Sequence, residues 1–561
     1  KTSEPLSLER KIKLRIVAWR ERMKNCLRKV HGVGKDEIVA SFSPGLAEVR
    51  LCFAWGAICC LKQELSDLLN GFFQSRKGDR CRVFANLPDE LWLPGWMEKY
   101  GEFRKDIHAR PLLELLGGQY GRQRANMDFD NFCVASLEKC GFVRNMDIHP
   151  CIHVRPVEDP NMQAWILQQE KSRGVVRPAK LPDEHVVPDS ICRYVDDLMT
   201  NFHKQVEWHA QRWAAIKEVM VVPKQVDMAG GKYIGGNFEC EYFEDRVETA
   251  IHAIPYVDKL VEEFELELSE KYPGKTLKPK STPVRPGSRI FQAESNERSE
   301  REAAEFQAEA EGRFAYTSRH WIGGLLFLMR LCRVDLGFAV VFWATFQGKW
   351  KVSCDDGLIW LFGYLKATRA LKQKGVLFFK DLWELSWELE TDGSHAACKA
   401  TRKGWSGVLL YLVGPHGTRF LVDWLSKRQT AVSGSAGETE YFSITSGTKM
   451  LIKLSSVLHY LAGLDDSTEE FFLKNLYTDS TVALSALKRQ YSDGLYHVRR
   501  TAGVSLAWNG AVWCPLLEDR MTRSHKHVHH RRGDVLGADA ITKAVEAEGI
   551  QFLRKSAMLE E

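Results

Sequence analysis

The sequence predicts a multidomain α/β (α+β) protein, and three observations carry this prediction. The chain has 561 residues, which at roughly 100–200 residues per domain corresponds to about three to five domains. Its composition, with 44% hydrophobic and 27% charged residues, is close to the globular average and excludes a collagen, a coiled coil or a wholly disordered chain. In the last third, three strand-like runs precede alternating helix and strand patterns, which is typical of a layered α/β domain.

Charge and cysteine content narrow the class of protein further. The 78 Lys and Arg residues against 73 Asp and Glu give a net charge of +5, which permits a nucleic-acid partner without requiring one. The 14 Cys residues contain no CxxC pair, so they indicate reduced thiols rather than a disulfide framework. A zinc site at Cys133, Cys140, Cys151 and His153 is an alternative, although this spacing matches no usual zinc finger.

No targeting or membrane-spanning segment is expected. The N-terminus lacks the basic, apolar and small-residue pattern of a signal peptide. The most apolar region, residues 321–346, is interrupted by Arg330, Arg333 and Asp335, and it therefore predicts a buried helix pair instead of a membrane span. Because the first residue is Lys, we expect the chain to be a piece of a longer protein.

The chain divides by composition into six segments. Residues 271–289 carry four Pro and many basic residues, and the stretch 291–312 that follows is acidic, so both predict a poorly packed tether. The predicted segments are an N-terminal segment (1–35), a mixed domain (36–267), a linker (268–318), a helical region (319–383), an α/β domain (384–545) and a tail (546–561). Within the α/β domain we expect strands at Leu385–Thr391, Gly407–Val413, Phe420–Ser426 and Phe471–Thr478, and helices at 438–462 and 480–488.

The tetrapeptide Tyr194-Val195-Asp196-Asp197 is the most informative motif of the first half. Two adjacent carboxylates framed by apolar residues are costly to fold unless a cation or a partner neutralises them. In a hairpin only one of them can point fully at a metal ion, so a further ligand must come from elsewhere in the chain. The alternative is that the pair caps a turn or a helix.

Four further acids stand at strand ends and helix starts of the C-terminal domain. Asp392 and Asp479 end strand patterns, Asp539 opens the last helix, and Glu440 lies on the apolar side of a long helix. Each acid alone could be a helix or turn cap, and the helix dipole accounts for Glu438 better than for Glu440. Together the four carboxylates form a D-E-D-D set suited to divalent cations.

These motifs resemble, in order and spacing, the Pol polyprotein of copia-type LTR retrotransposons, over about residues 40 to 545. The Tyr194–Asp197 motif is similar to the active-site hairpin of the reverse transcriptase, and the D-E-D-D set is similar to that of ribonuclease H. Further similar segments are Asp67–Phe73, Gln119–Ala125, Cys151–Val154, Lys232–Glu239, Gly324–Leu328, Tyr364–Thr368, Glu438–Tyr441, Thr478–Ala483 and Ala538–Lys543. Three departures stand out, namely Gly71 in place of Ala, Asn126 in place of Pro, and a loosely matched fingers segment at Lys13–Val17.

The resemblance implies a fold and two activities. Residues 1–35 would be degenerate fingers, 36–267 fingers and palm, 319–383 connection helices, and 384–545 a ribonuclease H-like mixed-sheet domain. The activities would be RNA-directed DNA polymerisation and cleavage of RNA–DNA hybrids, with two Mg²⁺ (or Mn²⁺) ions per active site. The implied catalytic residues are Asp67, Asp196, Asp197, Asp392, Glu440, Asp479, Asp539 and His529, of which Asp67, Asp196, Asp392, Glu440, Asp479 and Asp539 would bind metal. The implied nucleic-acid or nucleotide contacts are Tyr120, Gly121, Tyr194, Gly235, Arg15 and Arg499.

The implied partners are an RNA template, a DNA primer, RNA–DNA hybrid, dNTPs and the rest of the Gag-Pol polyprotein. No membrane partner is expected, and the oligomeric state is open. The implied location is a cytoplasmic virus-like particle, with the nucleus as an alternative.

Several alternatives stay open at this level. A competing alignment places Gln63 where Asp67 stands, and the His-rich run 525–530 could be a metal clip, although a loop contacting hybrid phosphates is favoured. His530 is a neighbouring candidate for the role given to His529. The chain could also be a decayed, non-catalytic relic, or be active only as a nuclease.

Overall fold

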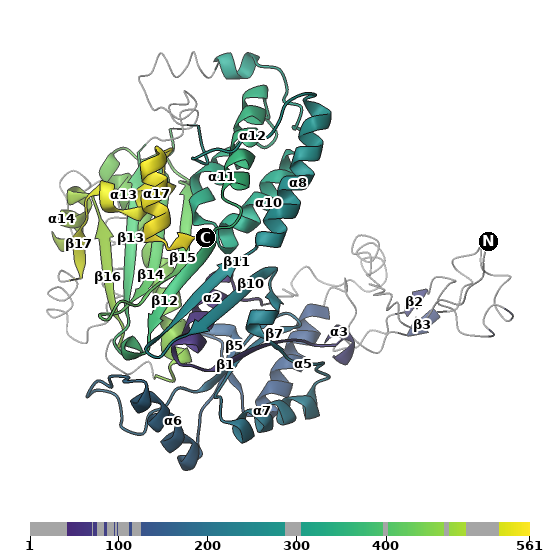
Figure 1. Cartoon of the computed structure of the whole chain (residues 1–561), viewed down its shortest axis with the longest axis vertical. Helices are drawn as coiled ribbons and strands as arrows, with labels where there is room; N and C mark the ends of the chain where they lie inside the picture. Colours follow the sequence, from purple (N-terminus) through teal and green to yellow (C-terminus); the bar gives the residue numbers. More distant parts are fainter. Residues whose placement is uncertain are drawn as a thin grey trace, which may run out of the picture.

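The protein is a mixed α/β structure with two large sheets (Figure 1). The computed structural model describes residues 42–69, 71–75, 84–86, 95, 98, 112–114, 125–285, 304–395, 402–464, 471–489 and 527–561. The predicted nucleic-acid contacts Arg15, Tyr120, Gly121 and Arg499 lie outside these residues, as does the fingers segment Lys13–Val17.

The first sheet is antiparallel and has six strands in the order β4-β5-β6-β7-β1-β8. Its strands are β1 (Lys62–Asp67), β4 (Val143–Asn145), β5 (His149–Arg155), β6 (Asp189–Tyr194), β7 (Asp197–Phe202) and β8 (Val226–Asp227). Helices α5 (Ala125–Lys139) and α7 (Val206–Val219) pack on one face of this sheet. Phe129, Trp213 and Ile216 from the two helices form a buried cluster there with Ile191 and Leu198.

The second sheet has ten strands and is mixed, because β13, β16 and β17 run parallel to one another. Its order is β17-β16-β13-β14-β15-β12-β11-β10-β9, with β18 paired to β12. The strands are β9 (Lys232–Tyr233), β10 (Gly236–Tyr242), β11 (Arg246–His252), β12 (Lys372–Phe378), β13 (Ser386–Ser394), β14 (Trp405–Val413), β15 (Arg419–Arg428), β16 (Leu473–Thr478), β17 (Val528–His530) and β18 (Leu559–Glu560).

This sheet runs across two of the segment boundaries drawn from the sequence. Strand β11 belongs to segment 36–267 and β15 to segment 384–545, and both pair with β12. Strand β12 itself lies in segment 319–383, which the sequence predicted as helical. The two halves of the chain therefore share one continuous sheet.

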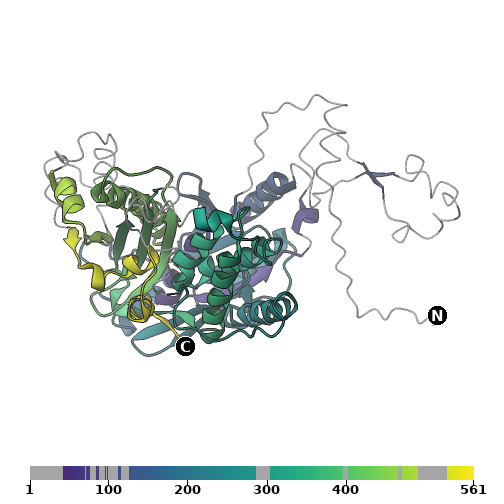
Figure 2. The ribbon, with the colours of Figure 1, turned by 90° about the horizontal axis from the view of Figure 1, so that it is seen from above.

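Helices cover the sheets on several sides. Four helices, α8 (Ile254–Lys271), α10 (Ser318–Leu331), α11 (Gly337–Ala344) and α12 (Val352–Ala367), gather beside the second sheet, as the view from above also shows (Figure 2). The long helix α13 (Ala436–Leu461) packs on β13 and β14. The other helices and strands are α3 (Gly71–Gln74), α6 (Pro160–Ser172), α14 (Thr481–Arg489), α17 (Ala547–Ser556) and the antiparallel pair of β2 (Phe84–Asn86) and β3 (Leu112–Glu114). None of the helices among the described residues has the length and apolar content that crossing a membrane requires.

Helix α2 (Leu46–Ile58) lies between the two sheets and is buried almost along its whole length. Its Arg50, 1% exposed, donates to the carbonyl oxygens of Val422 (2.6 Å) and Arg330 (2.8 Å) and to the Asp423 carboxylate (2.9 Å). The guanidinium also lies over the Trp424 ring at 4.0 Å. One buried cation thus joins the first half of the chain to β15.

The first part of the predicted tether is packed, contrary to the expectation. Leu277, Thr282 and Val284 are buried, and the carbonyl oxygen of Thr282 accepts a hydrogen bond from Trp360 Nε1 on α12 at 2.9 Å. Here the prediction is wrong, because a Pro-rich and basic composition does not exclude burial of the few apolar side chains present. Most of residues 304–311, in the acidic part, are exposed, as expected.

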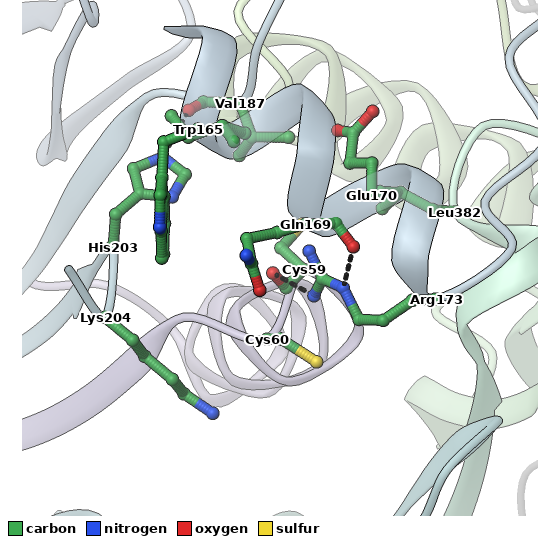
Figure 3. A pocket seen from close by; sticks show the side chains of 11 residues that line it. Cys59, Cys60, Trp165, Gln169, Glu170, Arg173, Val187, His203, Lys204 and Leu382 are labelled. Atoms are coloured by element: carbon green, nitrogen blue, oxygen red, sulfur yellow. Dashed lines mark hydrogen bonds between the residues drawn. The ribbon is translucent and has the colours of Figure 1, made fainter. Parts of the chain in front are cut away.

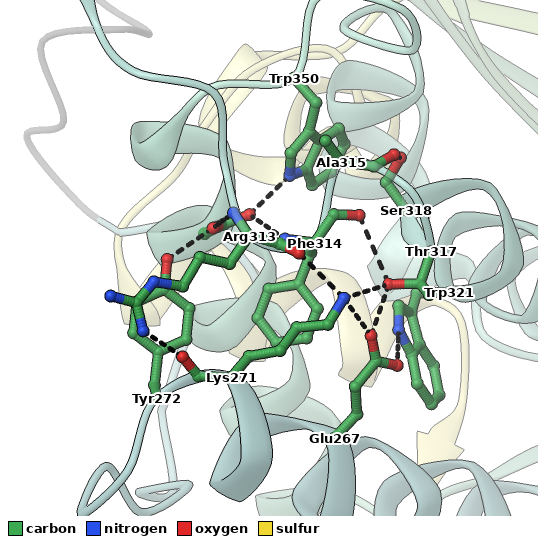
Figure 4. Close-up of polar contacts among 11 residues, drawn as sticks. Glu267, Lys271, Tyr272, Arg313, Phe314, Ala315, Thr317, Ser318, Trp321 and Trp350 are labelled. Carbon is green, nitrogen blue, oxygen red and sulfur yellow. Dashed lines mark hydrogen bonds and ion pairs between the residues drawn. The ribbon is translucent and has the colours of Figure 1, made fainter.

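A polar network fixes the same region (Figure 4). The Glu267 carboxylate at the end of α8 accepts hydrogen bonds from Thr317 Oγ1 (2.6 Å) and Trp321 Nε1 (2.9 Å), and it pairs with Lys271 (2.5 Å). Because these partners flank the stretch 272–316, the network ties α8 to the start of α10.

Candidate functional sites

The first cluster of acids forms where β1 meets the β6–β7 hairpin. Asp67, the last residue of β1, lies directly opposite Asp197, the first residue of β7, in the antiparallel register. Asp196 occupies the turn, and its carbonyl accepts a hydrogen bond from Leu68 N at 2.8 Å. The structure therefore brings together Asp67, Asp196 and Asp197, which the sequence grouped.

The competing alignment with Gln63 does not fit this geometry. Gln63 is buried in the middle of β1, where its amide donates to Asn201 Oδ1 (2.9 Å) and to Phe53 O (3.1 Å). It pairs with Asn201 near the other end of β7. Asp67, and not Gln63, is the acid beside the hairpin.

Both the turn and the charges of this cluster are unfavourable by themselves. Val195 has φ +57°, a left-handed conformation that costs a β-branched residue roughly 1–2 kcal/mol. Burial, followed by the charges of Asp196 and Asp67, raises the pKa of Asp197 to about 6. A bound cation would offset the repulsion among the three carboxylates.

Gly71 lies against the turn, which gives its departure from the family pattern a physical reason. A Cβ at this position would lie 2.8 Å from Phe129 Cζ and 3.1 Å from Asp196 Cβ. We therefore expect Gly71→Ala, although it restores the residue of the resembled family, to displace Asp196 and to weaken divalent-cation binding at this cluster. Mn²⁺ titration followed by electron paramagnetic resonance measures the effect, and unchanged or tighter binding would contradict this explanation.

The second cluster forms at the ends of β13 and β16 and at the start of α13. Asp392, Glu440 and Asp479 each bring a carboxylate oxygen within 4.8 Å of the others. Asp539, in the 3₁₀ helix Gly537–Ile541, flanks them, since a Cβ on Gly533 would lie 3.0 Å from Asp479 Oδ2 and 3.9 Å from Asp539 Oδ1. All four acids of the D-E-D-D set thus meet in one place.

Two glycines allow this close approach. A Cβ on Gly393 would lie 2.9 Å from the backbone of Thr439 and Glu440, so the glycine lets the start of α13 touch β13. Gly407 stands opposite Asp392 on β14, and a Cβ there would lie 2.6 Å from Ala538 O. The helix and the segment that carry Glu440 and Asp539 therefore reach Asp392 because both strand positions lack a side chain.

Burial and mutual repulsion perturb the acids of the second cluster. Burial, and next the charge of Asp539, raises the pKa of Asp392 to about 7. Burial, together with the charges of Asp392 and Asp479, raises the pKa of Glu440 to about 9, and burial also raises the pKa of Asp479. Such raised values mark a site that gains by binding a cation.

Neighbouring side chains hold the acids in place. Thr542 Oγ1 donates to Asp392 Oδ2, and Lys543 Nζ pairs with Asp539 at 2.5 Å. Sequence reasoning gave these two residues no role, although both lie in the quoted segment Ala538–Lys543.

The donor set fits Mg²⁺. The four ligand candidates all offer carboxylate oxygens, which Mg²⁺ and Mn²⁺ prefer. Glu440 Oε2 is buried and accepts no hydrogen bond from the described residues, so a cation would satisfy it. By contrast, the Glu438 carboxylate accepts a hydrogen bond from Gly434 N (2.7 Å), beside the N-cap residue Ser435. Glu438 lies in the first turn of α13, in agreement with the explanation that it stabilises the start of the helix.

The raised pKa values predict how stability depends on pH and metal. Acids with raised folded-state pKa values retain protons that the unfolded chain has released, so stability falls as pH rises from about 4 toward the folded values. Between about pH 7.5 and 8.5, where His residues are mostly neutral in both the folded and the unfolded state, we expect Tm in EDTA to fall as the pH rises. Mg²⁺ should raise Tm, and the increase should be larger at the higher pH because Mg²⁺ binds the ionised acids.

Differential scanning calorimetry of the parent and of Asp392→Asn checks this expectation. Both the fall in Tm and the increase caused by Mg²⁺ should shrink in the variant. An equal increase at both pH values would show that the ion binds elsewhere.

The structure places His529 differently from the prediction. Its ring stacks on Tyr477, with ring centroids 4.9 Å apart, and shares a hydrogen bond with Asn475 Oδ1 at 3.2 Å. His530 instead lies beside the second cluster, where Nε2 is 3.2 Å from the carbonyl oxygen of Asp479. Strand β17 determines this difference, because neighbouring residues on a strand face opposite sides.

Two predicted nucleic-acid contacts are described. Tyr194 ends β6 next to the first cluster, paired with Asp197. Gly235 lies in the β9–β10 turn with φ +80°, and a Cβ there would lie 3.0 Å from Phe327 Cζ on α10. The geometry thus accounts for Gly235 by its turn and its packing.

Other candidate sites have structural explanations. Among the described residues, one further set of three possible ligands comes within 4.8 Å, namely Asp381, Glu384 and His416. Asp381 accepts hydrogen bonds from His416 N (2.9 Å), His416 Nδ1 (2.6 Å) and Thr418 N (3.0 Å), so it clamps the β14–β15 turn. The zinc alternative is not supported, because Cys133, Cys140, Cys151 and His153 form no such set.

A pocket of about 250 Å³ lies at the opposite end of β7 from Asp197 (Figure 3). Lys204, Cys60 and Trp165 line it, together with Arg173 from the end of α6. The Arg173 guanidinium is engaged by Gln169 O (2.9 Å) and Cys59 O (3.1 Å). The pocket is therefore separate from the first cluster of acids.

Comparisons with known proteins give little further information. No protein-family model and no curated protein matches the chain. Among solved structures, the chain is similar to the protease–reverse transcriptase of prototype foamy virus at 11% identity, over 93% of this chain and 70% of that one. The TM-score of 0.18 is too low to support an argument.

Proposed function

We propose that the protein is a metal-dependent nuclease that cleaves the RNA strand of RNA–DNA hybrids, within a copia-type Pol polyprotein. The single observation that carries the proposal is the convergence of Asp392, Glu440 and Asp479 within 4.8 Å, with Asp539 beside them. Four neighbouring carboxylates repel one another when no cation is bound. Their oxygen atoms are also the ligands that Mg²⁺ prefers.

The residues of the second cluster have distinct tasks in this proposal. When bound there, two divalent cations supply an activated water and neutralise the leaving oxygen of the phosphodiester. Asp392, Glu440, Asp479 and Asp539 hold the cations. Thr542 fixes the orientation of the Asp392 carboxylate by donating to Oδ2, and Lys543 orients Asp539.

A second function, RNA-directed DNA polymerisation, is favoured by a separate observation. The antiparallel register sets Asp67 opposite Asp197 with Asp196 in the adjoining turn, so three acidic residues from two segments lie at the same end of the neighbouring strands β1 and β7. The partners proposed for this site are an RNA template, a DNA primer and dNTPs. The proposed setting is a Gag-Pol assembly such as a cytoplasmic virus-like particle.

One preparation of the full chain tests both functions. A hybrid with labelled RNA, incubated with Mg²⁺, should be cut in the RNA strand, whereas duplex DNA of the same sequence should stay intact. Primer extension on an RNA template tests the polymerase. Cleavage without extension leaves the nuclease proposal alone, and a folded protein inactive in both assays is a non-catalytic relic.

A further inference from the structure

The hairpin that carries Asp196 and Asp197 contains a buried cation directly before the Tyr194–Asp197 motif. Arg193, the fifth residue of β6, is 1% exposed although its neighbours Ile191 and Cys192 are apolar. A buried arginine needs both a counter-charge and hydrogen-bond acceptors. The structure shows where Arg193 finds each of them.

The counter-charge is Asp130 on α5, which is 5% exposed. Arg193 Nη2 donates to Asp130 Oδ1, and Arg144 Nη1 donates to Asp130 Oδ2 at 3.0 Å. Arg144 also donates to Pro150 O at 3.2 Å, which fixes it to the start of β5. One carboxylate on α5 is thus held between two arginines. Arg193 joins α5 to β6, and Arg144 joins it to β4 and to the start of β5.

The second acceptor of Arg193 is the turn itself. Arg193 Nη1 donates to the carbonyl oxygen of Val195 at 3.2 Å. Val195 is the residue with φ +57°, and Asp196 follows it directly. A β-branched residue keeps a left-handed conformation only where its surroundings hold it. The hydrogen bond from Arg193 to the Val195 carbonyl is one such constraint on the turn. A second is the hydrogen bond that Leu68 N, just after β1, donates to the Asp196 carbonyl at 2.8 Å.

We infer that Arg193, anchored by Asp130, is a positioning residue that sets the turn presenting the Asp196 carboxylate beside Asp67. The inference rests on the proposed polymerase site and deepens it. Arg193 would contact neither metal nor nucleotide, so its effect must pass through the geometry of the turn.

The chain offers a matched control in the same strand. Arg212 on α7, 3% exposed, donates through Nε to Asp189 Oδ2 at 2.9 Å, and Asp189 begins β6 whereas Tyr194 ends it. Arg212→Met therefore removes a buried arginine–carboxylate pair from the same sheet, but at the end away from the turn. It reports the general cost of losing such a pair.

The experiment measures Mn²⁺ affinity by electron paramagnetic resonance in the full chain, with the second cluster silenced by Asp392→Asn and Glu440→Gln. Asp196→Asn identifies the binding that belongs to the first cluster. We expect Arg193→Met to weaken that binding by about 10-fold or more, as losing a group that orients a metal ligand does. Arg212→Met should change it by less than about twofold, and Arg193→Lys should give an intermediate loss because one ammonium replaces a two-nitrogen fork.

The outcomes separate this inference from the proposed function. If the parent protein shows no Mn²⁺ binding that depends on Asp196, both the proposed polymerase site and this inference are wrong. Mn²⁺ binding that Arg193→Met and Arg212→Met weaken equally would leave the site in place and overturn the positioning role alone. If Arg193→Met does not fold, Arg193→Lys decides, and unchanged affinity in that variant overturns the inference.

Discussion

Asp392→Asn and Glu440→Gln are each expected to abolish cleavage of an RNA–DNA hybrid while the protein stays folded. Both acids lie in the second cluster, 5% and 7% exposed, and share one place with Asp479. Loss of one charged ligand removes the hold on the cations that activate water and neutralise the leaving oxygen. We expect a fall of roughly three orders of magnitude in rate, equivalent to about 4 kcal/mol in activation free energy.

Stability should move in the opposite direction from activity. Each substitution replaces an acid whose pKa is raised by burial and by the neighbouring charges, and so removes an ionisation that is costly in the folded state. Without metal, Tm at neutral pH should therefore rise or stay unchanged. Glu438→Gln is the matched control, since Glu438 lies two residues from Glu440 on α13 and only caps the helix. Cleavage by Asp392→Asn or Glu440→Gln at the rate of Glu438→Gln would show that the cluster is structural.

The C-terminal elements could be predicted from the sequence because local pattern and tertiary context agree there. The helix expected at 438–462 is α13 (Ala436–Leu461), and the strand expected at Phe471–Thr478 is β16 (Leu473–Thr478). Apolar residues at helical spacing face the sheet, and β-branched and aromatic runs form its strands. The buried helix pair expected at 321–346 is likewise present as α10 and α11.

Pairing between distant strands could not be predicted in the same way. Strand β12 (Lys372–Phe378) has alternating burial and stands between β11 and β15, far from both in sequence. A single strand pattern does not specify its partners, because register depends on which apolar faces meet in three dimensions. The sequence therefore divided the chain into segments at a place where the sheet is continuous.

The acids of both clusters were found from the sequence, but their supports were not. A carboxylate beside an apolar run is conspicuous because its burial is costly, which made Asp196 and Asp392 visible, whereas Asp67 was implied by the family resemblance. Thr542 and Gly407 act through contacts with residues remote in the chain, and Arg193 is anchored by the remote Asp130; no local pattern marks such contacts. The position of His529 could not be predicted for the same reason, because its ring stacks on Tyr477 only through the pairing of β17 with β16.

Arg50→Met is expected to destabilise the whole chain, because Arg50 joins its two halves. The substitution keeps the side-chain length but leaves the Asp423 carboxylate and the carbonyls of Val422 and Arg330 without their donor. Removing one partner of a buried ion pair typically costs about 3–5 kcal/mol, which for a chain of 561 residues corresponds to a fall in Tm of roughly 3–4 °C. Urea unfolding of the parent and of the variant, followed by tryptophan fluorescence, measures the change.

Arg246→Met provides the comparison for this prediction. Arg246 pairs with Asp245 (3.2 Å) and, within β11, with Glu248 (2.9 Å), but its side chain is 32% exposed, so its loss should destabilise the chain far less than the loss of Arg50. Asp423→Leu combined with Arg50→Met should recover part of the loss, since no buried charge then remains unpaired.

Because α2 packs between the two sheets, the same argument predicts that residues 384–561 alone expose the face that α2 covers and aggregate. Equal stability of Arg50→Met and Arg246→Met would mean that the two halves of the chain do not depend on this contact.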